Sequence, residues 1–341
     1  MTPGWWHERR VLVTGAAGFI GSALCRELAG RVAHLRGIDN LERGRLEHLS
    51  GVLPRLEFQR ADLSDREVAR RACDGMDVVL HFAAKVGGIG LYLEQPYQTA
   101  AANARIDTNV CDSVARTGGT IMIYASSAHV YPDERQTSPD SPPLAEPDAY
   151  PANPTLSYGW EKLFGERLLE ALVHEGRRSG RAIHAAPLRL VGAFGPGQDD
   201  DLRTGSAIPV FIRRALDYPK NGPFIVRGTG RETRSYCYID DIVAAVLRAA
   251  EALDQRDWLP PMNVGAEGRV SMDEVARLVV AAVGKPIPIE FDPSFPTVIW
   301  GQAVTCQLAR ELLGNWRPQV ALEEGIRRCC AAALARQGGA A

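Results

Sequence analysis

Tyr158 and Lys162 lie four residues apart in the stretch SYGWEKLFGE. If this stretch is helical, the two side chains lie on one face, one turn apart. A tyrosine with a pKa of about 10 is a poor base at neutral pH, but a nearby ammonium and a positively charged cofactor ring both favour the phenolate. Tyr158 could then take a proton from an alcohol hydroxyl, so the pair is a candidate acid/base centre.

Ser127 and His129 lie earlier in the chain, in ASSAHVYPDE at the end of an apolar run. Residues two apart on an extended strand share a face, so we expect His129 to point the same way as Ser127, provided the chain is still extended there. The ordinary pKa of histidine, about 6.5, suits proton exchange at neutral pH. Three roles stay open for His129: binding a substrate hydroxyl, exchanging a carbon-bound proton as a single base, and filling the core.

A glycine-rich loop lies near the N-terminus, where VLVTGAAGFIGSALCREL places Gly15, Gly18 and Gly21 between an apolar run and an amphipathic segment. Glycines allow a tight turn and a close approach to a pyrophosphate, which the free N–H groups of a helix N-terminus then bind. Asp39 follows about 20 residues later, at the end of the next apolar run, where its carboxylate can accept from both ribose hydroxyls. Because this carboxylate would repel a 2′-phosphate, the pattern predicts NAD rather than NADP.

Two further stretches extend the predicted cofactor site. RADLSD offers Asp62 as an adenine contact, with a helix N-cap as the alternative. HFAAKVGG brings backbone and Lys85 to the end of another strand, and the carboxyl ends of parallel strands form the ligand-facing edge of such sheets.

The elements that must position these residues alternate through the first half of the chain. Short apolar runs and helical patterns follow one another as RVLVTG, IGSALCRELAG, HLRGIDN, DREVARRAC, DVVLHFAA, ARIDTNVCDSVARTG and TIMIYASS. This alternation predicts an α/β fold with a Rossmann-type, doubly wound parallel sheet.

The second half of the chain is mixed. Helices are predicted at IPVFIRRALDY, IDDIVAAVLRAAEAL and LEEGIRRCCAAALAR, and a strand at IPIEF. We therefore predict an NAD-binding Rossmann domain with the catalytic helix over residues 1–190, and a smaller mixed α/β substrate domain over 191–341, with segments of the second able to return to the first. Two long loops, residues 131–156 and 195–209, are predicted to be binding loops rather than surface linkers.

The bulk composition excludes several classes of function. The 39 basic and 41 acidic side chains give a net charge of −2, which indicates neither a nucleic-acid-binding nor a membrane-binding surface. There is no apolar run of the roughly 20 residues that a membrane span needs and no signal-peptide pattern, so a cytoplasmic protein is predicted. The seven scattered cysteines favour reduced, buried thiols, and no metal site is expected.

Taken together, the motifs resemble the extended short-chain dehydrogenase/reductases, specifically the nucleotide-sugar epimerases and dehydratases. The resemblance runs through TGAAGFIG, HFAAKVGG, ASSAHVYP, YGWEK, GRETRSYCYIDD, MNVGAEGRVSMDEVA and LGNWRPQVALEEGIRR, nearly the whole chain. The pattern is most similar to GDP-mannose 3,5-epimerases, and AAKVGG is also similar to GDP-fucose synthases. The resemblance implies a tightly bound, recycled NAD, a nucleotide-diphosphate sugar as substrate, and a homodimer.

The resemblance also implies roles for individual residues. Ser127 and Tyr158 would assist oxidation at the sugar C4, Lys162 would hold the nicotinamide ribose, and Arg234 would bind the sugar diphosphate. The predicted catalytic residues are Tyr158, Lys162, Ser127 and His129. The predicted cofactor contacts are Gly15, Gly18, Phe19, Ile20, Gly21, Asp39, Asn40, Asp62, Leu63, Ala83, Ala84, Lys85, Asn103, Tyr158 and Lys162. The predicted substrate contacts are Ser126, Ser127, His129, Gly87, Gly88 and Arg234.

Departures from the family pattern decide between its reactions. The 3,5-epimerase and fucose-synthase patterns carry an acid/base cysteine where this chain has His129, and their partner residue falls here on Ser206 or Ala207, neither of which is an acid at neutral pH. The acidic pair of dehydratases reads Ala128–His129. Near the diphosphate an expected asparagine reads Gly192, and a late arginine reads Gln302.

Inversion at C4 needs only Ser127, Tyr158 and Lys162, with room for a 4-keto sugar to rotate. The favoured prediction is therefore an NAD-dependent C4 epimerase of a GDP- or other nucleotide-diphosphate hexose or heptose. The alternative is C3/C5 epimerisation with His129 as acid/base. A 4,6-dehydratase and a non-catalytic dinucleotide-binding regulator rank below both.

Overall fold

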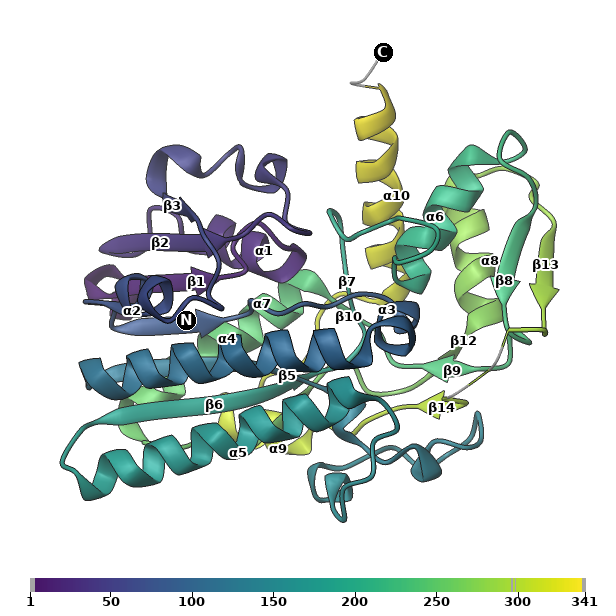
Figure 1. Cartoon of the computed structure of the whole chain (residues 1–341). Helices are drawn as coiled ribbons and strands as arrows, with labels where there is room; N and C mark the ends of the chain where they lie inside the picture. The colour runs from purple at the N-terminus through teal and green to yellow at the C-terminus, as the bar shows by residue number, and fades with distance from the viewer. Residues whose placement is uncertain (1–3, 296, 298, 339–341) are drawn as a thin grey trace.

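A parallel sheet of seven strands organises the molecule (Figure 1), and the computed structural model describes residues 4–295, 297 and 299–338. The strand order is β11-β6-β5-β4-β1-β2-β3. The strands are β1 (Arg10–Thr14), β2 (His34–Asp39), β3 (Glu57–Arg60), β4 (Val78–His81), β5 (Thr120–Ser127), β6 (Ile183–Leu190) and β11 (Met262–Val264). The chain runs outward from β1 to β3, returns to β4 beside β1 and continues outward again, which confirms the doubly wound Rossmann-type fold.

Both faces of the sheet are buried. Successive side chains of a strand point to opposite faces, and here each set joins a hydrophobic core. Within β1, Val11 and Val13 join one hydrophobic core while Leu12 joins the other. Helices α1 (Phe19–Leu28) and α7 (Ile239–Ala252) cover the first face. Helices α2 (Arg66–Cys73), α4 (Pro96–Thr117) and α5 (Ser157–Arg178) cover the second. This double burial explains why the strands read as nearly continuous apolar runs.

The C-terminal part packs three helices against short strands at one side of the sheet (Figure 1). Its helices are α6 (Ala207–Asp217), α8 (Met272–Val283) and α10 (Leu322–Gly338), with the short α9 (Gln307–Leu312) nearby. Its strands are β7 (Ala193–Phe194), β8 (Phe224–Arg227), β9 (Thr233–Arg234), β10 (Cys237–Tyr238), β12 (Val270–Ser271), β13 (Ile289–Asp292) and β14 (Gly301–Gln302). Strands β8 and β13 pair in parallel, and β9 lies between β12 and β14.

Segments after residue 190 return to the first half, since β11 pairs with β6 as an edge strand of the main sheet. The boundary between residues 190 and 191 stays a prediction. The first long loop, residues 131–156, is fixed to β6 and α5 of the first half by one buried side chain. Arg189, at the end of β6, forms an ion pair of 2.8 Å with Glu166 of α5 and donates to the Glu146 carbonyl of the loop. The loop is therefore packed against the rest of the structure and is not a free lid.

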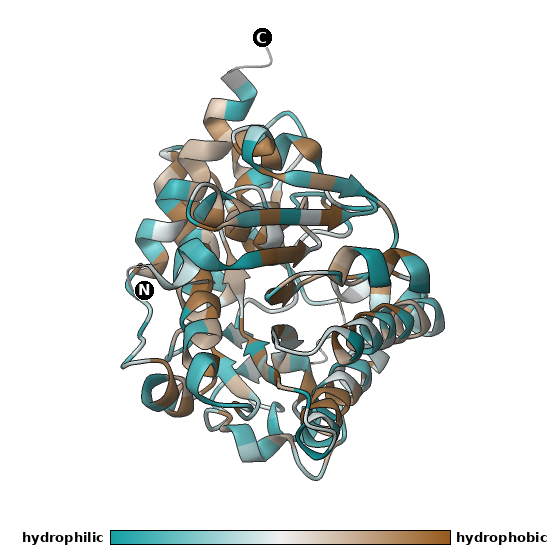
Figure 2. Ribbon diagram, turned by 90° about the vertical axis from the view of Figure 1, so that its left-hand side faces the viewer, coloured by the Kyte–Doolittle hydropathy of each residue, from teal (hydrophilic) through white to brown (hydrophobic). Residues whose placement is uncertain are grey.

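The surface and the interior differ in character as expected for this architecture. In Figure 2 the central strands carry hydrophobic residues, and the surrounding helices carry many hydrophilic ones. All seven cysteines are buried free thiols. Within the described part of the chain, no helix combines the length and apolar character that crossing a membrane requires.

Candidate active site

The glycine loop lies between β1 and α1, at the carboxyl edge of the sheet. Gly15 has a φ of +67°, and a Cβ there would lie 2.9 Å from the Phe82 carbonyl oxygen. A Cβ at Gly21 would lie 2.0 Å from the Gly15 carbonyl oxygen. Helix α1 begins at Phe19 with Gly18 as its N-cap, so first-turn N–H groups, including that of Ile20, have no partner within the helix. The loop is a cradle shaped for a pyrophosphate, and it fits NAD.

Asp39 ends β2 beside this cradle. Its carboxylate accepts hydrogen bonds from the backbone N–H groups of Ala17 at 3.0 Å and Leu41 at 2.8 Å. Burial raises the pKa of Asp39, while these backbone donors oppose the rise. Each carboxylate oxygen has a further lone pair that can accept from a ribose hydroxyl. This geometry leaves the carboxylate free to accept from a ribose, and the role of Asp39 stays a prediction.

The predicted adenine side of the site is held together by its own polar contacts. Asn40 donates to Asp62 at 3.2 Å, and Asp62 accepts from the backbone N–H of Ser64 at 2.8 Å. Helix α2 takes Asp65 as its N-cap, so the alternative of Asp62 as that N-cap is wrong. Leu63 is buried next to Asp62.

The segment after β4 is held by Asn103 of α4, which is fully buried. The Lys85 backbone N–H donates to Oδ1 of Asn103 at 2.6 Å, and Nδ2 donates back to the Lys85 carbonyl at 3.2 Å. This clamp fixes the backbone path of Ala83 and Ala84. The Lys85 ammonium forms an ion pair of 2.8 Å with Glu42, which joins two loops that border the predicted cofactor site.

Tyr158 and Ser127 meet at the carboxyl end of β5. Tyr158 lies in the first turn of α5, and the next residue is Gly159, where a Cβ would lie 2.2 Å from the His129 carbonyl oxygen. The missing side chain lets α5 approach the turn that follows Ser127. Burial and then the charge of Glu161 raise the pKa of Tyr158, and its hydrogen bond with Ser127 lowers the pKa only in part.

Lys162 is buried and does not face the Tyr158 hydroxyl alone. Its Nζ lies 3.3 Å from Glu161 Oε1 and 3.3 Å from the Tyr124 hydroxyl, and it lies 5.7 Å from the centre of the Tyr158 ring. Burial lowers the pKa of Lys162, but the carboxylates of Glu161 and Asp107 outweigh it, so the pKa is raised. Lys162 is therefore an ammonium. The Lys162 ammonium is expected to lower the pKa of Tyr158. In the protein alone this pKa is raised instead, because burial and the charge of Glu161 both raise it.

His129 reaches the site by a route that differs from the prediction. Strand β5 ends at Ser127, and Ala128–Val130 form a 3-10 turn in which the Ser127 hydroxyl accepts from the His129 N–H at 3.2 Å. The chain is therefore not extended at His129, and the condition for a face shared with Ser127 is not met. The imidazole nevertheless lies edge-on to the Tyr158 ring at 5.7 Å between ring centres. Burial and then the cation of Arg234 lower the pKa of His129 to about 4. His129 is neutral at neutral pH.

The other predicted substrate contacts divide into two groups. The guanidinium of Arg234 donates to the carbonyls of Thr233 and Ile299 at 2.7 and 2.9 Å, and it lies close enough to His129 to shift the pKa of the imidazole. Ser126 points elsewhere, since its hydroxyl donates to buried Glu166 at 2.6 Å. The structure thus brings Arg234 to the site but not the side chain of Ser126.

The glycines after β4 meet other parts of the chain. Gly88 N–H donates to the Thr204 carbonyl of the second long loop at 2.8 Å. Gly87 N–H donates to the Tyr92 hydroxyl at 3.2 Å. These contacts place the second long loop beside the segment after β4.

Tyr92 is a site residue that the sequence reasoning missed. It lies in the short helix α3 (Ile89–Glu94), and its ring stacks on that of Tyr158 with 4.6 Å between centres and 18° between planes. Nothing in its local sequence marks it. Glu161 was also missed, although it lies between Tyr158 and Lys162 and accepts from Asn103 at 2.7 Å. Asp107 was missed as well, and its spacing, four residues after Asn103 on the same face of α4, is the one signal that could have found it.

Two departures from the family pattern have a local packing reason. Gly192 has a φ of +54°, and a Cβ there would lie 1.9 Å from the Ser235 carbonyl oxygen. Gln302 is buried and donates to Gln136 of the first long loop at 2.9 Å. Gly192 and Gln302 therefore both contribute to the packing of loops against each other.

Comparison with known proteins extends this geometry to a family. The model of the NAD dependent epimerase/dehydratase family matches residues 11–265. GDP-mannose 3,5-epimerase of Arabidopsis thaliana is 31% identical over 325 residues, 95% of this chain and 82% of that protein. UDP-glucose 4-epimerase of Mycolicibacterium smegmatis is 30% identical over 325 residues, 94% and 96% of the two chains.

A solved structure agrees with these relatives. The UDP-glucose 4-epimerase of Thermus thermophilus, in complex with NAD, aligns with a TM-score of 0.78 and 26% identity over 95% of this chain and 98% of that one. Similarity of this extent shows that the chain belongs to the NAD-dependent epimerase/dehydratase family of enzymes.

Proposed function

We propose that the protein is an NAD-dependent epimerase that inverts C4 of a nucleotide-diphosphate sugar through a transient 4-keto intermediate. One observation carries the choice of carbon. Ser127, Tyr158 and Lys162 gather at the end of β5, whereas α6, where an acid/base partner for His129 would stand, begins with Ser206 as N-cap and Ala207 as first residue. Inversion at C3 or C5 needs a proton acceptor on one face and a donor on the other, and this chain offers no such pair there.

Tyr158 would move the hydroxyl proton at C4. Bound NAD would supply the two-electron oxidation and re-reduction at that carbon, and in its oxidised form a positive charge near Tyr158. Ser127 would hold the C4 oxygen while Tyr158 accepts its proton and later returns it. Because Tyr158 and Lys162 are buried, water is kept from the proton that Tyr158 holds between the two steps.

Arg234 supports a substrate with a negative charge next to the sugar. Its buried guanidinium is held by two backbone carbonyls, which carry no formal charge. The Glu232 carboxylate acts on this guanidinium by charge, and a diphosphate would add a counter-charge in direct contact with it. The two relatives named above act on a GDP-sugar and a UDP-sugar, so hexoses and heptoses of either nucleotide are the candidate substrates.

C3/C5 epimerisation is the second candidate. It is favoured by the neutral imidazole of His129, which can accept a carbon-bound proton, and by its contact with Tyr158 at 5.7 Å between ring centres. A 4,6-dehydratase is disfavoured, because this chain has Ala128–His129 where dehydratases carry an acidic pair. A non-catalytic regulator would have no use for the assembled Tyr158 and Lys162.

We also propose that NAD stays bound through turnover. The second long loop is tied to both loops that border the cofactor site, by an ion pair between Asp199 and Arg43 and by the Gly88–Thr204 hydrogen bond. These ties would have to open for the cofactor to leave. A homodimer formed through α4 and α5 is the proposed assembly.

The deciding experiment is incubation with GDP-mannose, UDP-glucose and ADP- or GDP-heptose in deuterated water, with the products analysed by NMR. Inversion at C4 without solvent deuterium would support the proposal and make His129 a binding residue. Deuterium at C3 or C5 would overturn it in favour of His129 as an acid/base. H129Q is the matched variant, since it should abolish deuterium exchange but leave C4 inversion measurable. No turnover of any sugar would favour the regulator.

A further inference from the structure

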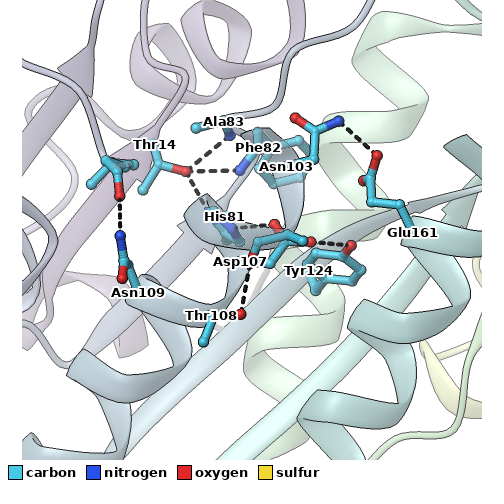
Figure 3. Close-up of polar contacts among 12 residues, drawn as sticks. Thr14, His81, Phe82, Ala83, Asn103, Asp107, Thr108, Asn109, Tyr124 and Glu161 are labelled. Atoms are coloured by element: carbon cyan, nitrogen blue, oxygen red, sulfur yellow. Dashed lines mark hydrogen bonds and ion pairs between the residues drawn. The ribbon is translucent and has the colours of Figure 1, made fainter. Parts of the chain in front are cut away.

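A continuous set of buried polar contacts leads from β1 to the catalytic lysine. Figure 3 shows its first part, from Thr14 through His81 and Asp107 to Tyr124. Thr14 Oγ1 lies 2.8 Å from His81 Nδ1, and His81 Nε2 lies 3.0 Å from Asp107 Oδ1. The Tyr124 hydroxyl donates to Asp107 Oδ2 at 2.7 Å and accepts from Lys162 Nζ at 3.3 Å. All five side chains are nearly inaccessible to solvent.

Hydrogen-bond valence fixes the direction of each contact. Thr14 Oγ1 accepts from the backbone N–H groups of Phe82 and Ala83, both at 3.0 Å, so its own proton is left for His81 Nδ1. His81 then carries its proton on Nε2 and donates it to Asp107. With Tyr124 donating to the other oxygen, Asp107 is an ionised carboxylate with two donors, one on each oxygen.

The charges agree with these directions. Burial raises the pKa of Asp107, but the ammonium of Lys162 and the donors His81 and Tyr124 outweigh it, so the pKa is lowered. The Tyr124 hydroxyl, having given its proton to Asp107, offers its oxygen to the ammonium. Asp107 and Lys162 are thus a buried ion pair joined through one phenol.

Gly165 gives independent evidence that the position of Tyr124 is built into the fold. It lies on α5 one turn after Lys162, and a Cβ there would lie 2.2 Å from the Tyr124 hydroxyl oxygen. Any other residue would push the phenol away from the helix that carries the lysine. The contact between β5 and α5 at this point therefore depends on the absence of a side chain at Gly165.

We propose that Asp107 is a positioning residue, which holds the ammonium of Lys162 next to Tyr158 through the Tyr124 hydroxyl. The inference deepens the proposed function, on which its catalytic meaning rests. The structural part of the proposal, that Asp107 and Tyr124 hold the Lys162 ammonium, can be tested without a substrate. Because Thr14 also accepts from Phe82 and Ala83, the same set of contacts ties the lysine to the loop after β4 that borders the cofactor site.

Five groups face Lys162 and must be considered in any titration. Glu161 and Tyr158 belong to its own helix, Tyr124 to β5, Asp107 to α4 and Tyr92 to α3. Of these, Asp107 is the anion that acts through another side chain, whereas Glu161 contacts the ammonium directly. Removing Asp107 or the Tyr124 hydroxyl therefore tests the indirect path while Glu161 remains.

The test is an NMR titration of lysine in the purified protein, which has only four lysines: Lys85, Lys162, Lys220 and Lys285. With lysine labelled with ¹³C at Cε, the Lys162 signal is assigned by elimination in K85R, K220R and K285R. In the wild type this signal should keep its ammonium position up to about pH 10. In D107N it should titrate below that pH, with a downward shift of about one unit or more, and Y124F should shift it in the same direction.

D112N is the control, because Asp112 is exposed on the same helix and pairs with Arg66. It should leave the Lys162 signal unchanged. The proposal is overturned if Lys162 keeps its ammonium position up to about pH 10 in both folded variants. If D107N does not fold, Y124F decides alone. If Asp107 and Tyr124 had a merely structural role, the variants would lose thermal stability without moving the Lys162 signal. A wild type that turns over no sugar would count against the proposed function only.

Discussion

His129 combines a half-buried imidazole with a neighbouring cation, and this makes it a source of pH-dependent stability. Its pKa in the folded protein is about 4, whereas an exposed histidine has a pKa of about 6.5. As the pH falls between these values the unfolded chain binds the proton first, so the free energy of unfolding falls. The contribution is present above pH 6.5 and is lost toward pH 4, with a slope of at most about 1.4 kcal/mol per pH unit.

We therefore expect H129N to lose less stability than the wild type between about pH 6.5 and 4. Urea unfolding at several pH values in this range measures the difference. His7 is exposed in the first turn of the chain, so H7N should follow the wild type and serves as the control. Parallel curves for H129N and the wild type would show that the pKa of the His129 imidazole is the same in the folded and unfolded chains.

Tyr158 should be required for turnover but not for folding. The Y158F variant keeps the ring that stacks on Tyr92 and loses only the group that carries the proton. We expect kcat to fall by about 10²–10⁴-fold, the usual contribution of a general acid/base, with the NAD content per chain unchanged. Turnover of the accepted sugar and absorbance of the cofactor released by acid measure the two quantities. Y97F, at an exposed tyrosine, is the control, and a Y158F rate within tenfold of the wild type would contradict the assignment.

The placement of the candidate site residues was predictable from the sequence where residue type and spacing are both demanding. Gly15, Asp39, Tyr158 and Lys162 follow from such patterns, and the structure places them at one edge of the sheet. Asp107 was not predicted, because a carboxylate on a helix is usually solvated and only tertiary packing buries this one.

The turn between β1 and α1 depends on the absence of a side chain at Gly21. A Cβ there would lie 2.0 Å from the Gly15 carbonyl oxygen, and backbone cannot give way as a flexible side chain would. We expect G21A to lower stability by about 1–3 kcal/mol and to reduce the NAD retained per chain. Thermal unfolding and the cofactor content after gel filtration check both. G51A is the control because no atom lies within 4 Å of its added Cβ, and a G21A protein with normal cofactor content would show that the loop has another path.

Regular elements were predictable where hydrophobic periodicity is strong. The run TIMIYASS became β5, and the segment with Tyr158 became α5. The turn at Ala128–Val130 was not predicted, because nothing in the apolar pattern marks where β5 ends. The hydroxyl of Ser127 caps that turn and re-aims His129, so a local hydrogen bond decided the direction of a candidate catalytic residue.

The two halves of the molecule are joined by more than the loop between them. Asn263 of β11 donates its backbone N–H to Glu146 of the first long loop at 3.0 Å, and β11 extends the main sheet from the second half. Such contacts join residues far apart in sequence, so no local pattern could reveal them. They make the first long loop a part of the scaffold that carries the candidate site.

The outer face of α4 and α5 carries the predicted dimer interface. Trp160 and Phe164 are about half exposed and one turn apart on α5, and Tyr97 is 77% exposed at the start of neighbouring α4. A second copy would bury these rings, whereas two glutamates would bring charge repulsion and desolvation. We expect light scattering to give twice 37.1 kDa for the wild type and a single chain for W160E/F164E. L334E, at an exposed leucine on α10, should stay dimeric, and a dimeric double variant would place the interface elsewhere.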